Sequence, residues 1–508
     1  MSDAELLVYG GTAAGVCAAV AAARHGVQVT LLEPGRHVGG MVSGGLGYTD
    51  IGNPAVVGGL AREFAAAVGD YYGVPPGHHA GPEPHVAERI FLEWLDRAGV
   101  TVRFGTTLTA ASIVDGRILS VSGADGRECR AGVYVDASYE GDLLAAAGVG
   151  YRVGRESRSR YGETFAGRRE PAPGKHNFVP YLSPFDAGGR LLPLIHDAPA
   201  VDAGEGDGGV MAYGYRVCLT SAGDRLPFPR RDGYREDEWE LARRYFALLA
   251  ERGIEVTAGD LIGLVPNLPN GKCDGNSIGP LSLNLLDGTN WAYPEADEAG
   301  RERIRRRHRE YTMDFLYFLS HDPAVPEAVR RGITAWGLPP DEFTDTGGLP
   351  HQLYVREARR MVGEYVLTEH DLLPRPRPQY DAVAMGSYHI DIREVRRTWR
   401  WVYEHPDPIP MVFNEGYLSV PVRPYQIPYR SIVPRYAECT NLLVPVCLSA
   451  SHVAFGSVRM EVQYEMLGHA AGLAAALALK GDRAVQRVDV TDLQERLAAE
   501  GQVLALPA

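Results

Sequence analysis

The clearest hydrophobic pattern in this chain lies between residues 6 and 47. A short apolar run at residues 6–9 precedes a glycine-rich turn, an alanine-rich segment at 13–25 and a second apolar run at 27–32. Buried parallel strands read as continuous apolar runs, so this order predicts a strand, a tight turn, a helix and a parallel strand. Such a βαβ unit holds the diphosphate of a dinucleotide.

The turn itself departs from the G-x-G-x-x-G template, because Thr12 stands where a third glycine is expected. An apolar helix with incidental glycines is therefore a competing interpretation. The predicted helix would aim its N-terminal N–H groups and its dipole at a phosphate. We expect the diphosphate to contact Gly10, Gly11, Thr12, Ala13, Ala14 and Gly15.

An acid and a second glycine-rich segment follow the second apolar run. Glu33 comes 23 residues after Gly10, close to the ~20 expected for an acid that binds a ribose hydroxyl. A flavin domain uses further glycines to let its backbone pass close to the diphosphate and the isoalloxazine ring, which favours FAD over NAD. The expected FAD contacts are Glu33, Pro34, Gly39, Gly40, Met41, Gly44, Gly45 and Leu46.

Later segments predict helices at residues 59–68 and 86–98, then strands at 101–104, 108–114, 117–122 and 129–135. Asp-Gly pairs between the strands indicate hairpin turns of a meander. His78, His79 and His85 lie in a loop without acidic or cysteine partners at ligand spacing, so we expect solvated histidines and no metal site. Near the end, a strand is expected at 441–446, a loop at 447–456 and a helix at 458–479, with Gly468 and Gly472 for close packing.

Composition narrows the function classes. A chain of 508 residues has room for about three domains at roughly 150 residues each. Its net charge of −13, without a basic cluster, argues against binding to nucleic acid or to a membrane surface. The first strand leaves no room for a secretory signal, and the scattered cysteines form no C-x-x-C pair, so we expect a protein of the reducing cytoplasm with neither a zinc site nor a disulfide framework.

Several segments together resemble the FAD-dependent oxidoreductase family of the glutathione-reductase-like superfamily, distantly similar to fumarate reductase and succinate dehydrogenase flavoproteins. They are residues 135–151, 153–162, 213–220, 271–276, 351–367, 385–391 and 425–472. The resemblance implies an α/β fold, with a Rossmann-like FAD-binding domain and an inserted α+β substrate or cap domain. We expect residues 1–165 to form the first part of the FAD domain, 166–424 the cap, and 425–508 the C-terminal return and terminal helix.

The resemblance also implies that the returning segment completes the flavin site. The residues expected to contribute are Ala137, Ser138, Asp142, Ser449, Ser451, Ser457 and Val458. Relatives often carry an acid just after the returning strand, whereas this chain has Ser449 and Ser451 there. A covalent flavin link through a histidine or Cys447 is conceivable, but nothing in the sequence demands it.

No second glycine-rich βαβ unit occurs between residues 166 and 424, so no dedicated NAD(P)H domain is expected. Electrons would then enter from the substrate itself. A base must remove a proton from the substrate's hydroxyl or amine, and histidine is the commonest base near neutral pH. His452 is the favoured candidate, with His389 and His351 behind it, although His452 could instead bond structurally to a backbone carbonyl.

Arginines supply the second chemical signal. Tyr354, Arg356, Glu357, Arg359 and Arg360 fall on an expected helix, where the arginines could clamp a carboxylate or hydroxyl-rich substrate or merely form surface ion pairs. Tyr354, Arg356 and Arg459 are the catalytic-site candidates besides His452. Other polar candidates near the cleft are Arg423, Arg430, Lys272, Asp274 and Asn276.

Taken together, the sequence predicts an FAD-dependent dehydrogenase or oxidase. Its substrate would be a small polar molecule, possibly sugar-like, oxidised at a hydroxyl or amine carbon by hydride transfer to the flavin; the electron acceptor is not identified. Two alternatives stay open: a flavin-containing lyase or isomerase, and a C–C desaturase.

Overall fold

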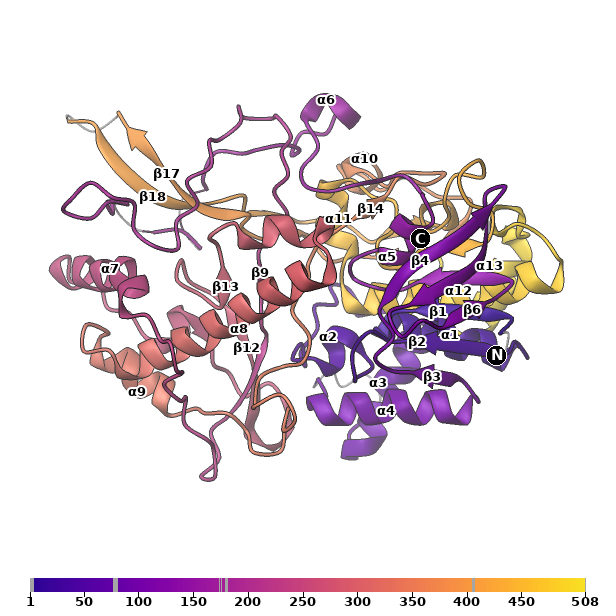
Figure 1. Ribbon diagram of the computed structural model, residues 1–508, viewed down its shortest axis with the longest axis horizontal. Coiled ribbons are helices and arrows are strands. Elements are labelled where there is room, and N and C mark those ends of the chain that lie inside the picture. The colour runs from indigo at the N-terminus through magenta and orange to yellow at the C-terminus, as the bar shows by residue number, and fades with distance from the viewer. Residues whose placement is uncertain are drawn as a thin grey trace.

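The computed structural model describes residues 4–75, 81–172, 174, 176–178, 181–403 and 407–507. His78 and His79 lie outside these described residues. Two bodies of structure lie side by side (Figure 1), one built on a parallel sheet and the other on helices α7, α8 and α9. Each has its own hydrophobic core, which we call the sheet core and the helical core.

A five-stranded parallel sheet forms the centre of the first body. Its order is β21-β7-β1-β2-β3, and β1 pairs with β2 and β7 on either side. The strands are β1 (Leu6–Tyr9), β2 (Val29–Leu32), β3 (Thr101–Arg103), β7 (Val133–Asp136) and β21 (Leu442–Leu443). The predicted βαβ unit is confirmed, and so is the strand that returns from the far end of the chain to pair with β7.

Two helices cross closely beside this sheet. They are α1 (Ala13–Arg24) and α12 (Glu461–Lys480). A Cβ at Gly468 would lie 2.1 Å from the carbonyl oxygen of Ala14, and one at Gly472 would lie 2.2 Å from that of Ala18. The predicted close packing is therefore confirmed. The single helix predicted at 458–479 is instead two, α11 (His452–Val458) and α12, separated at residues 459 and 460.

The predicted helices and meander are present with shifted ends. α3 (Gly59–Tyr72) and α4 (Pro84–Arg97) pack beside α1 and α12. β4 (Leu108–Val114), β5 (Arg117–Gly123) and β6 (Glu128–Arg130) form an antiparallel sheet whose first hairpin turns at Asp115 and Gly116, both at positive φ. The strand predicted at 129–135 divides into β6 and β7, because the chain leaves the meander there to rejoin the parallel sheet.

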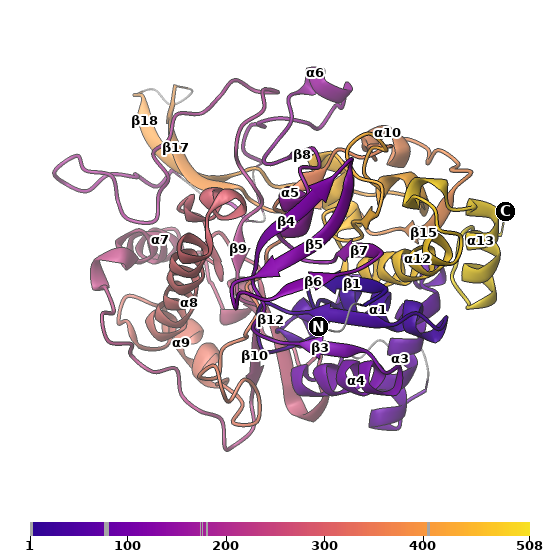
Figure 2. The ribbon, with the colours of Figure 1, turned by 45° about the vertical axis from the view of Figure 1, so that its right-hand side comes forward.

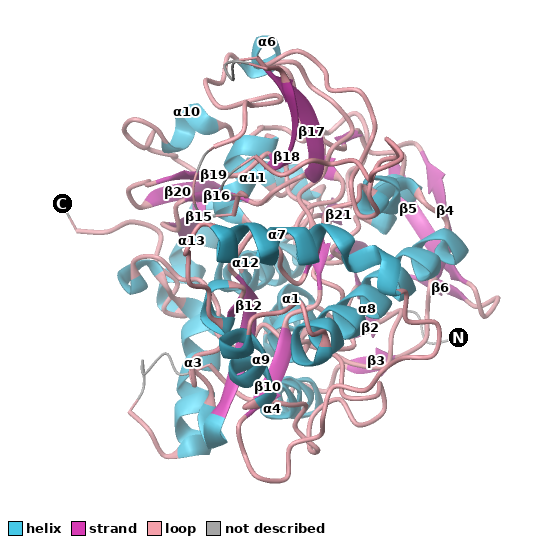
Figure 3. Ribbon diagram, turned by 90° about the vertical axis from the view of Figure 1, so that its left-hand side faces the viewer, coloured by secondary structure: helices cyan, strands magenta, loops and turns pink. Residues whose placement is uncertain are grey.

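The helical core draws its buried residues from positions 182–349 and from Val412. Figure 3 shows α7 (Glu240–Glu251), α8 (Glu298–His321) and α9 (Glu327–Thr334) toward the viewer. They accompany a three-stranded sheet in the order β10 (Val217–Thr220), β12 (Lys272–Ser277), β11 (Ile262–Gly263). A long hairpin of β17 (Arg396–Val402) and β18 (Ile409–Glu415) projects from this side of the molecule (Figure 2).

The remaining helices and strands are short. They are α2 (Gly40–Ser43), α5 (Asp142–Ala146), α6 (Arg158–Tyr161), α10 (Glu369–Leu372), α13 (Val490–Ala499), β8 (Tyr151–Arg152), β9 (Tyr213–Gly214), β13 (Asn284–Leu285), β14 (Arg360–Met361), β15 (Ala382–Gly386), β16 (Ile390–Ile392), β19 (Leu418–Val420) and β20 (Tyr425–Pro428). No helix in the described part of the chain is long and apolar enough to cross a membrane.

The helix expected around Tyr354 to Arg360 is wrong. Residues 353–359 carry no helix, and β14 at Arg360 pairs with β8. Their arginines are buried rather than displayed on a solvated face. Val355, Leu367 and Val383 pack into the sheet core, so much of the chain between residues 353 and 392 lies with the parallel sheet.

Candidate functional site

The turn after β1 is compact enough to require glycine at two positions. Gly10 has φ +96°, and a Cβ there would lie 2.6 Å from the backbone nitrogen of Ser138 at the end of β7. A Cβ at Gly15 would lie 1.9 Å from the carbonyl oxygen of Gly10. The first turn of α1 therefore packs directly onto the end of β1. Because neither glycine carries a side chain, the N-terminus of this helix stays open to a phosphate.

Thr12 explains why this chain departs from the three-glycine template. Its hydroxyl oxygen accepts a hydrogen bond from the Gly15 N–H (3.2 Å) and donates to the carbonyl of Ala137 (2.8 Å). Thr12 is thus the N-cap of α1 and also joins the helix to the end of β7. A glycine could make neither side-chain contact.

Glu33 lies at the end of β2, beside the same turn. One carboxylate oxygen accepts from the Gly11 N–H (2.7 Å) and the other from the Gly35 N–H (2.5 Å). Burial raises the pKa of Glu33 to about 7, although the two N–H donors act in the opposite direction. The acid is close to the turn, as its spacing in the sequence predicts.

The second glycine-rich segment packs against the end of β7. Gly39 and Gly40 have φ of +96° and +54°, and a Cβ at Gly40 would meet the hydroxyl of Tyr139 at 2.4 Å. That hydroxyl accepts from the Met41 N–H (2.9 Å) and donates to Glu461 (2.8 Å). Burial raises the pKa of Glu461 to about 8, so this carboxyl holds its proton at neutral pH.

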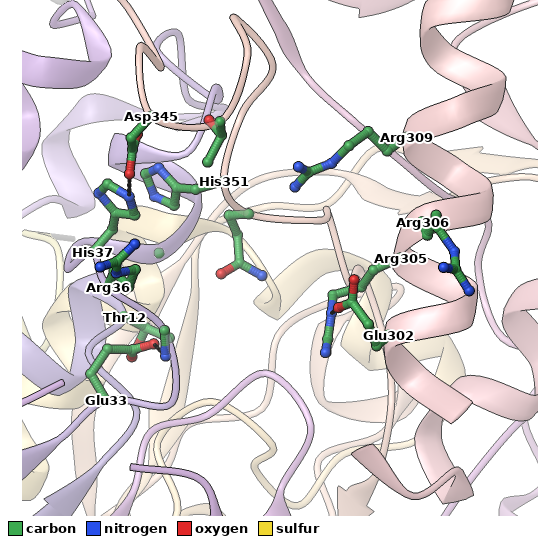
Figure 4. Close-up of a pocket in the computed structure, with 14 residues that line it drawn as sticks. Thr12, Glu33, Arg36, His37, Glu302, Arg305, Arg306, Arg309, Asp345 and His351 are labelled. Atoms are coloured by element: carbon green, nitrogen blue, oxygen red, sulfur yellow. Dashed lines mark hydrogen bonds and ion pairs between the residues drawn. The ribbon is translucent and has the colours of Figure 1, made fainter. Parts of the chain in front are cut away.

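Two adjoining cavities open above these residues, with volumes of about 590 and 240 Å³. Both are lined by Thr12, Glu33, Gly35, Arg305, His351 and Gln352. Figure 4 shows Arg305, Arg306 and Arg309 on α8 across the larger cavity from Thr12 and Glu33. The cleft is therefore bounded by the glycine turn on one side and by a row of cationic side chains on the other.

His351, a secondary histidine candidate, also lines this cleft. Its ring stacks on that of His37 at 4.1 Å, and His37 forms an ion pair with Asp345 at 3.0 Å (Figure 4). Burial lowers the pKa of His351 to about 3, which keeps its ring neutral.

The expected cofactor residues near β7 have defined partners. Ser138 donates through its hydroxyl to Asp136 (2.7 Å), whereas Asp142 forms ion pairs with Arg301 (2.7 Å) and Arg359 (2.9 Å). Ser138 and Asp142 line the smaller cavity together with Gly10 and Pro34. Of the expected cofactor residues, the smaller cavity thus brings together Gly10, Thr12, Glu33, Pro34, Ser138 and Asp142, whereas Gly44, Gly45 and Leu46 line neither cavity.

The C-terminal group lies deeper. Ser449 accepts from the Gly363 N–H (3.0 Å), Ser451 caps α11 and bonds to Glu163, and Ser457 bonds to Tyr425 (2.8 Å). All three are buried, as is Val458, and none lines the two cavities. Their side chains are engaged within the protein.

His452 belongs to a buried charged network. Its Nδ1 lies 2.8 Å from Glu357, whose carboxylate also bonds to Arg360, and Arg360 pairs with Glu156 at 2.6 Å. Burial pushes the pKa of Glu357 upward, but His452 and Arg360 together bring it below the usual range. The Nε2 atom of His452 is buried and has no hydrogen-bond partner among the described residues. His452 lines neither of the two cavities beside the glycine turn.

A third, polar cavity of about 130 Å³ collects the predicted arginine and tyrosine candidates. Arg356, Arg459 and Tyr354 line it, with Arg459 donating to the Tyr354 hydroxyl (3.1 Å). His389 lines it as well, whereas His452 does not. Residues 351–356 run from the wall of the nucleotide-sized cleft to the wall of this polar cavity.

Other residues of the polar cavity were not identified as site residues from the sequence. They are Asp50, His176, Arg216, Ser277, Ile278, Tyr388, Asp391, Arg393 and Tyr417. Arg216 and Asp391 fall within the segments 213–220 and 385–391 that carry the family resemblance, which was the available signal. Of the polar trio, Asn276 lines this cavity and Asp274 pairs with Arg216 (2.6 Å). Of the other arginine candidates, Arg430 pairs with Asp381 (2.9 Å) and Arg423 is exposed.

The sequence predicts no acidic partner for His85 at ligand spacing, and this prediction is wrong. His85 lies 2.7 Å from Glu342, which comes 257 residues later and could not be seen at local spacing. Glu83 and Asp341 complete the group. The ammonium of Lys272 already contacts all three carboxylates at 2.7 to 2.8 Å, so their charge is compensated by the protein itself.

The parallel sheet, the glycine turn at the start of α1 and the acid at the end of β2 define a Rossmann-type dinucleotide-binding protein. A family model described as FAD dependent oxidoreductase matches residues 5–497. The chain belongs to this family. The residues present fit its cofactor, because Gly10 and Gly15 leave no side chain over the helix N-terminus and two cavities adjoin that turn.

Several solved structures match part of this chain. L-proline dehydrogenase from P. horikoshii is 17% identical over 30% of this chain and 58% of its own, with a TM-score of 0.25. THI4 from Thermovibrio ammonificans is 20% identical over 30% of this chain and 67% of its own, with a TM-score of 0.24. The 3-ketosteroid-delta4-(5alpha)-dehydrogenase from Rhodococcus jostii RHA1 is 18% identical over 28% of this chain and 48% of its own, with a TM-score of 0.20. The matched part spans less than two thirds of most such chains. No curated protein gives a significant match.

Proposed function

We propose that this chain oxidises a small polar substrate at a carbon that bears a hydroxyl or an amine. The polar cavity carries the proposal, because it is small and lined by charged side chains, and because one segment, residues 351–356, contributes to its wall and to that of the nucleotide-sized cleft. The sequence has no second glycine-rich βαβ unit for a nicotinamide. Electrons would therefore enter from the substrate.

FAD, when bound, supplies the acceptor for a hydride from the substrate carbon. Gly10 to Gly15 would hold its diphosphate, Glu33 its ribose, and Gly39 to Leu46 the parts nearer the ring. Ser138 and Asp142 support this assignment, because they line the same cavity as Gly10 and Glu33. The C-terminal serines would act through backbone groups, since their side chains already have partners.

The binding of FAD should depend on pH through Glu33. A ribose hydroxyl donates best to the ionised carboxylate, and the pKa of Glu33 lies at about 7, above its usual 4.5. Lowering the pH through 7 protonates the acid and weakens the binding of FAD. We expect the apparent Kd for FAD to be about tenfold higher at pH 6 than at pH 8. Flavin fluorescence titrations would measure this.

A Glu33→Gln protein is the matched control for this pH effect. It should bind FAD weakly at both pH values and show no step between them. An equal Kd at pH 6 and pH 8 in the unaltered protein would show that Glu33 does not bind the ribose in its ionised form.

We further propose that the helical core belongs to a cap over the cofactor, within the segment 166–424. The separate core and the α8 arginines facing Thr12 and Glu33 support this arrangement (Figure 4). The buried residues Val355, Leu367 and Val383 would then lie beneath the cap, because they pack in the sheet core.

His452 is the proposed base, oriented by Glu357 through its Nδ1. With Nδ1 held by the carboxylate, the free Nε2 is the atom that would take a proton from the substrate. We expect His452→Ala to keep its FAD and to lower kcat by about 10²- to 10⁴-fold, the usual contribution of a positioned base. Stopped-flow measurement of flavin reduction would give the rate.

Two further variants make that result specific. His25→Ala removes a histidine at the surface, paired with Glu500, and should retain full turnover. His389→Ala tests the histidine that lines the polar cavity. If turnover survives His452→Ala but disappears in His389→Ala, then His389 is the base.

The reaction itself can be tested by anaerobic bleaching of the FAD-loaded protein. Sugars, polyols, amines and hydroxy acids are mixed with it in the absence of oxygen, and loss of the visible flavin absorbance reports oxidation of the substrate. Bleaching by a member of this panel is the expected result. Product formed without bleaching and without any acceptor would instead identify a lyase or isomerase.

A further inference from the structure

Arg356 has the least compensated charge in the polar cavity. Its side chain is buried, its guanidinium donates to the carbonyl of Ala212, and its centre lies 4.1 Å from the Tyr354 ring centroid. Within the described part of the chain, no carboxylate lies at ion-pair distance from it. A buried guanidinium without an acid is costly, which suggests that its partner comes from outside the protein.

Two nearby acids, Asp274 and Asp391, are already engaged with other arginines. Arg216 forms two hydrogen bonds with Asp274 (2.7 and 2.6 Å), and Arg459 pairs with Asp391 (3.2 Å). Burial, together with repulsion from the surrounding arginines, lowers the pKa of Arg356 to about 9. The ordinary arginine value is far higher, so this buried position disfavours the charged form of Arg356 unless an anion joins it.

Unused hydrogen-bond donors point the same way. The Nε atom of Arg459 and the Nη2 atom of Arg393 are buried without a hydrogen-bond partner among the described residues, whereas the Nε atom of Arg393 lies 3.4 Å from a carboxylate oxygen of Glu394. Buried donors in native proteins are nearly always satisfied, so these two donors require an acceptor. A carboxylate offers two oxygens that match the planar guanidinium.

The acids of the cavity restrict the anion further. Asp50 and Asp391 line the same small space as Arg356. They would repel a doubly charged phosphate more than a singly charged carboxylate, and they can accept from a hydroxyl or an ammonium group on the same molecule.

We propose that Arg356 binds the carboxylate of the substrate, which makes the substrate a small hydroxy acid or amino acid. This inference rests on the proposed oxidation at a hydroxyl or amine carbon and specifies which such molecules enter the cavity. Arg393 and Arg459 supply further donors, and Asp50 and Asp391 accept from the group that is oxidised.

The test compares acids with neutral analogues of the same skeleton. Glycolate, lactate, glycine and proline are titrated into the FAD-loaded protein by calorimetry, beside ethylene glycol, propane-1,2-diol, ethanolamine and prolinol. We expect at least one acid to bind about tenfold or more tightly than its neutral analogue, since one charge-assisted pair accounts for such a factor. Arg356→Gln should remove that advantage, and Arg356→Lys should keep part of it.

Circular dichroism and flavin content establish that each variant is folded, and Arg303→Gln, at an exposed arginine of α8, should bind like the unaltered protein. Absence of binding by every acid, equal binding of the neutral analogues, or full binding by Arg356→Gln would each overturn the carboxylate assignment. Bleaching by a neutral alcohol would then leave the proposed oxidation standing. Acids that bind through Arg356 but never bleach the flavin would overturn the oxidation alone.

Discussion

A Gly15→Ala protein is expected to be purified without FAD. The added Cβ would lie 1.9 Å from the carbonyl oxygen of Gly10, an overlap that only a backbone shift can relieve. Such a shift separates the N-terminus of α1 from the end of β1 and distorts the N–H groups that face the diphosphate. We expect the Kd for FAD to rise by about 100-fold or more, since two lost charge-assisted hydrogen bonds account for such a factor. The measurement is flavin content after purification, followed by titration with FAD.

The matched control is Gly223→Ala, where an added Cβ meets nothing within 4 Å and φ is not positive. This variant should be purified with its full flavin. Because overpacking costs about 1 to 3 kcal/mol, Gly15→Ala should still fold, and circular dichroism would establish this. A folded Gly15→Ala protein with normal flavin content would contradict the assignment of this turn to the diphosphate.

The second large effect is expected at Arg360. This side chain is fully buried, bonds to Glu357 and Glu156 and donates to two backbone carbonyls. Arg360→Leu would leave two buried carboxylates without their shared cation. Breaking a buried pair in this way costs about 3 to 5 kcal/mol in the free energy of unfolding, because both carboxylates lose their shared cation and remain out of water. Urea denaturation at neutral pH measures this loss.

Arg97→Leu provides the comparison, because Arg97 forms an exposed pair with Glu93 at 3.0 Å. Such surface pairs contribute about 0 to 1 kcal/mol, so this variant should unfold at nearly the same urea concentration as the unaltered protein. If the two substitutions cost the same, the buried network does not stabilise the fold as described.

The elements that sequence could predict are those with a local signature. The apolar runs of β1 and β2, the glycine turn between them and the paired Gly468 and Gly472 each carry their own physical reason within a few residues. The return of β21 to the sheet was expected from the family resemblance and from the apolar run that precedes α11.

The wrong prediction of a helix at residues 353–359 also has a physical reason. Arg356 and Arg360 are four residues apart, which is the spacing of neighbours on one helix face. In the structure Arg360 instead reaches Glu156 and the carbonyl of Gly154, both more than 200 residues away in the chain. Distant partners that outweigh local preference cannot be seen in a local pattern.

The polar cavity shows the same limit. Its arginines come from separate segments around residues 216, 356, 393 and 459. Each segment could be noticed in the sequence through the family resemblance or through its charged residues. That the four segments line one cavity follows only from the folded chain. Arg216 and Arg393 were missed for this reason, whereas Arg356 and Arg459 were chosen on residue type.

The pairing of β21 with β7 joins parts of the chain that are synthesised far apart in time. The ribosome releases the N-terminal strands first, yet the edge of β7 and the face of α1 at Ala14 and Ala18 are covered only by residues 442–480. Until those residues emerge, about 300 positions after β7, the nascent chain exposes an unpaired strand edge of the kind that recruits chaperones or aggregates. The parallel sheet that carries the glycine turn is therefore completed only after the C-terminal residues have been made.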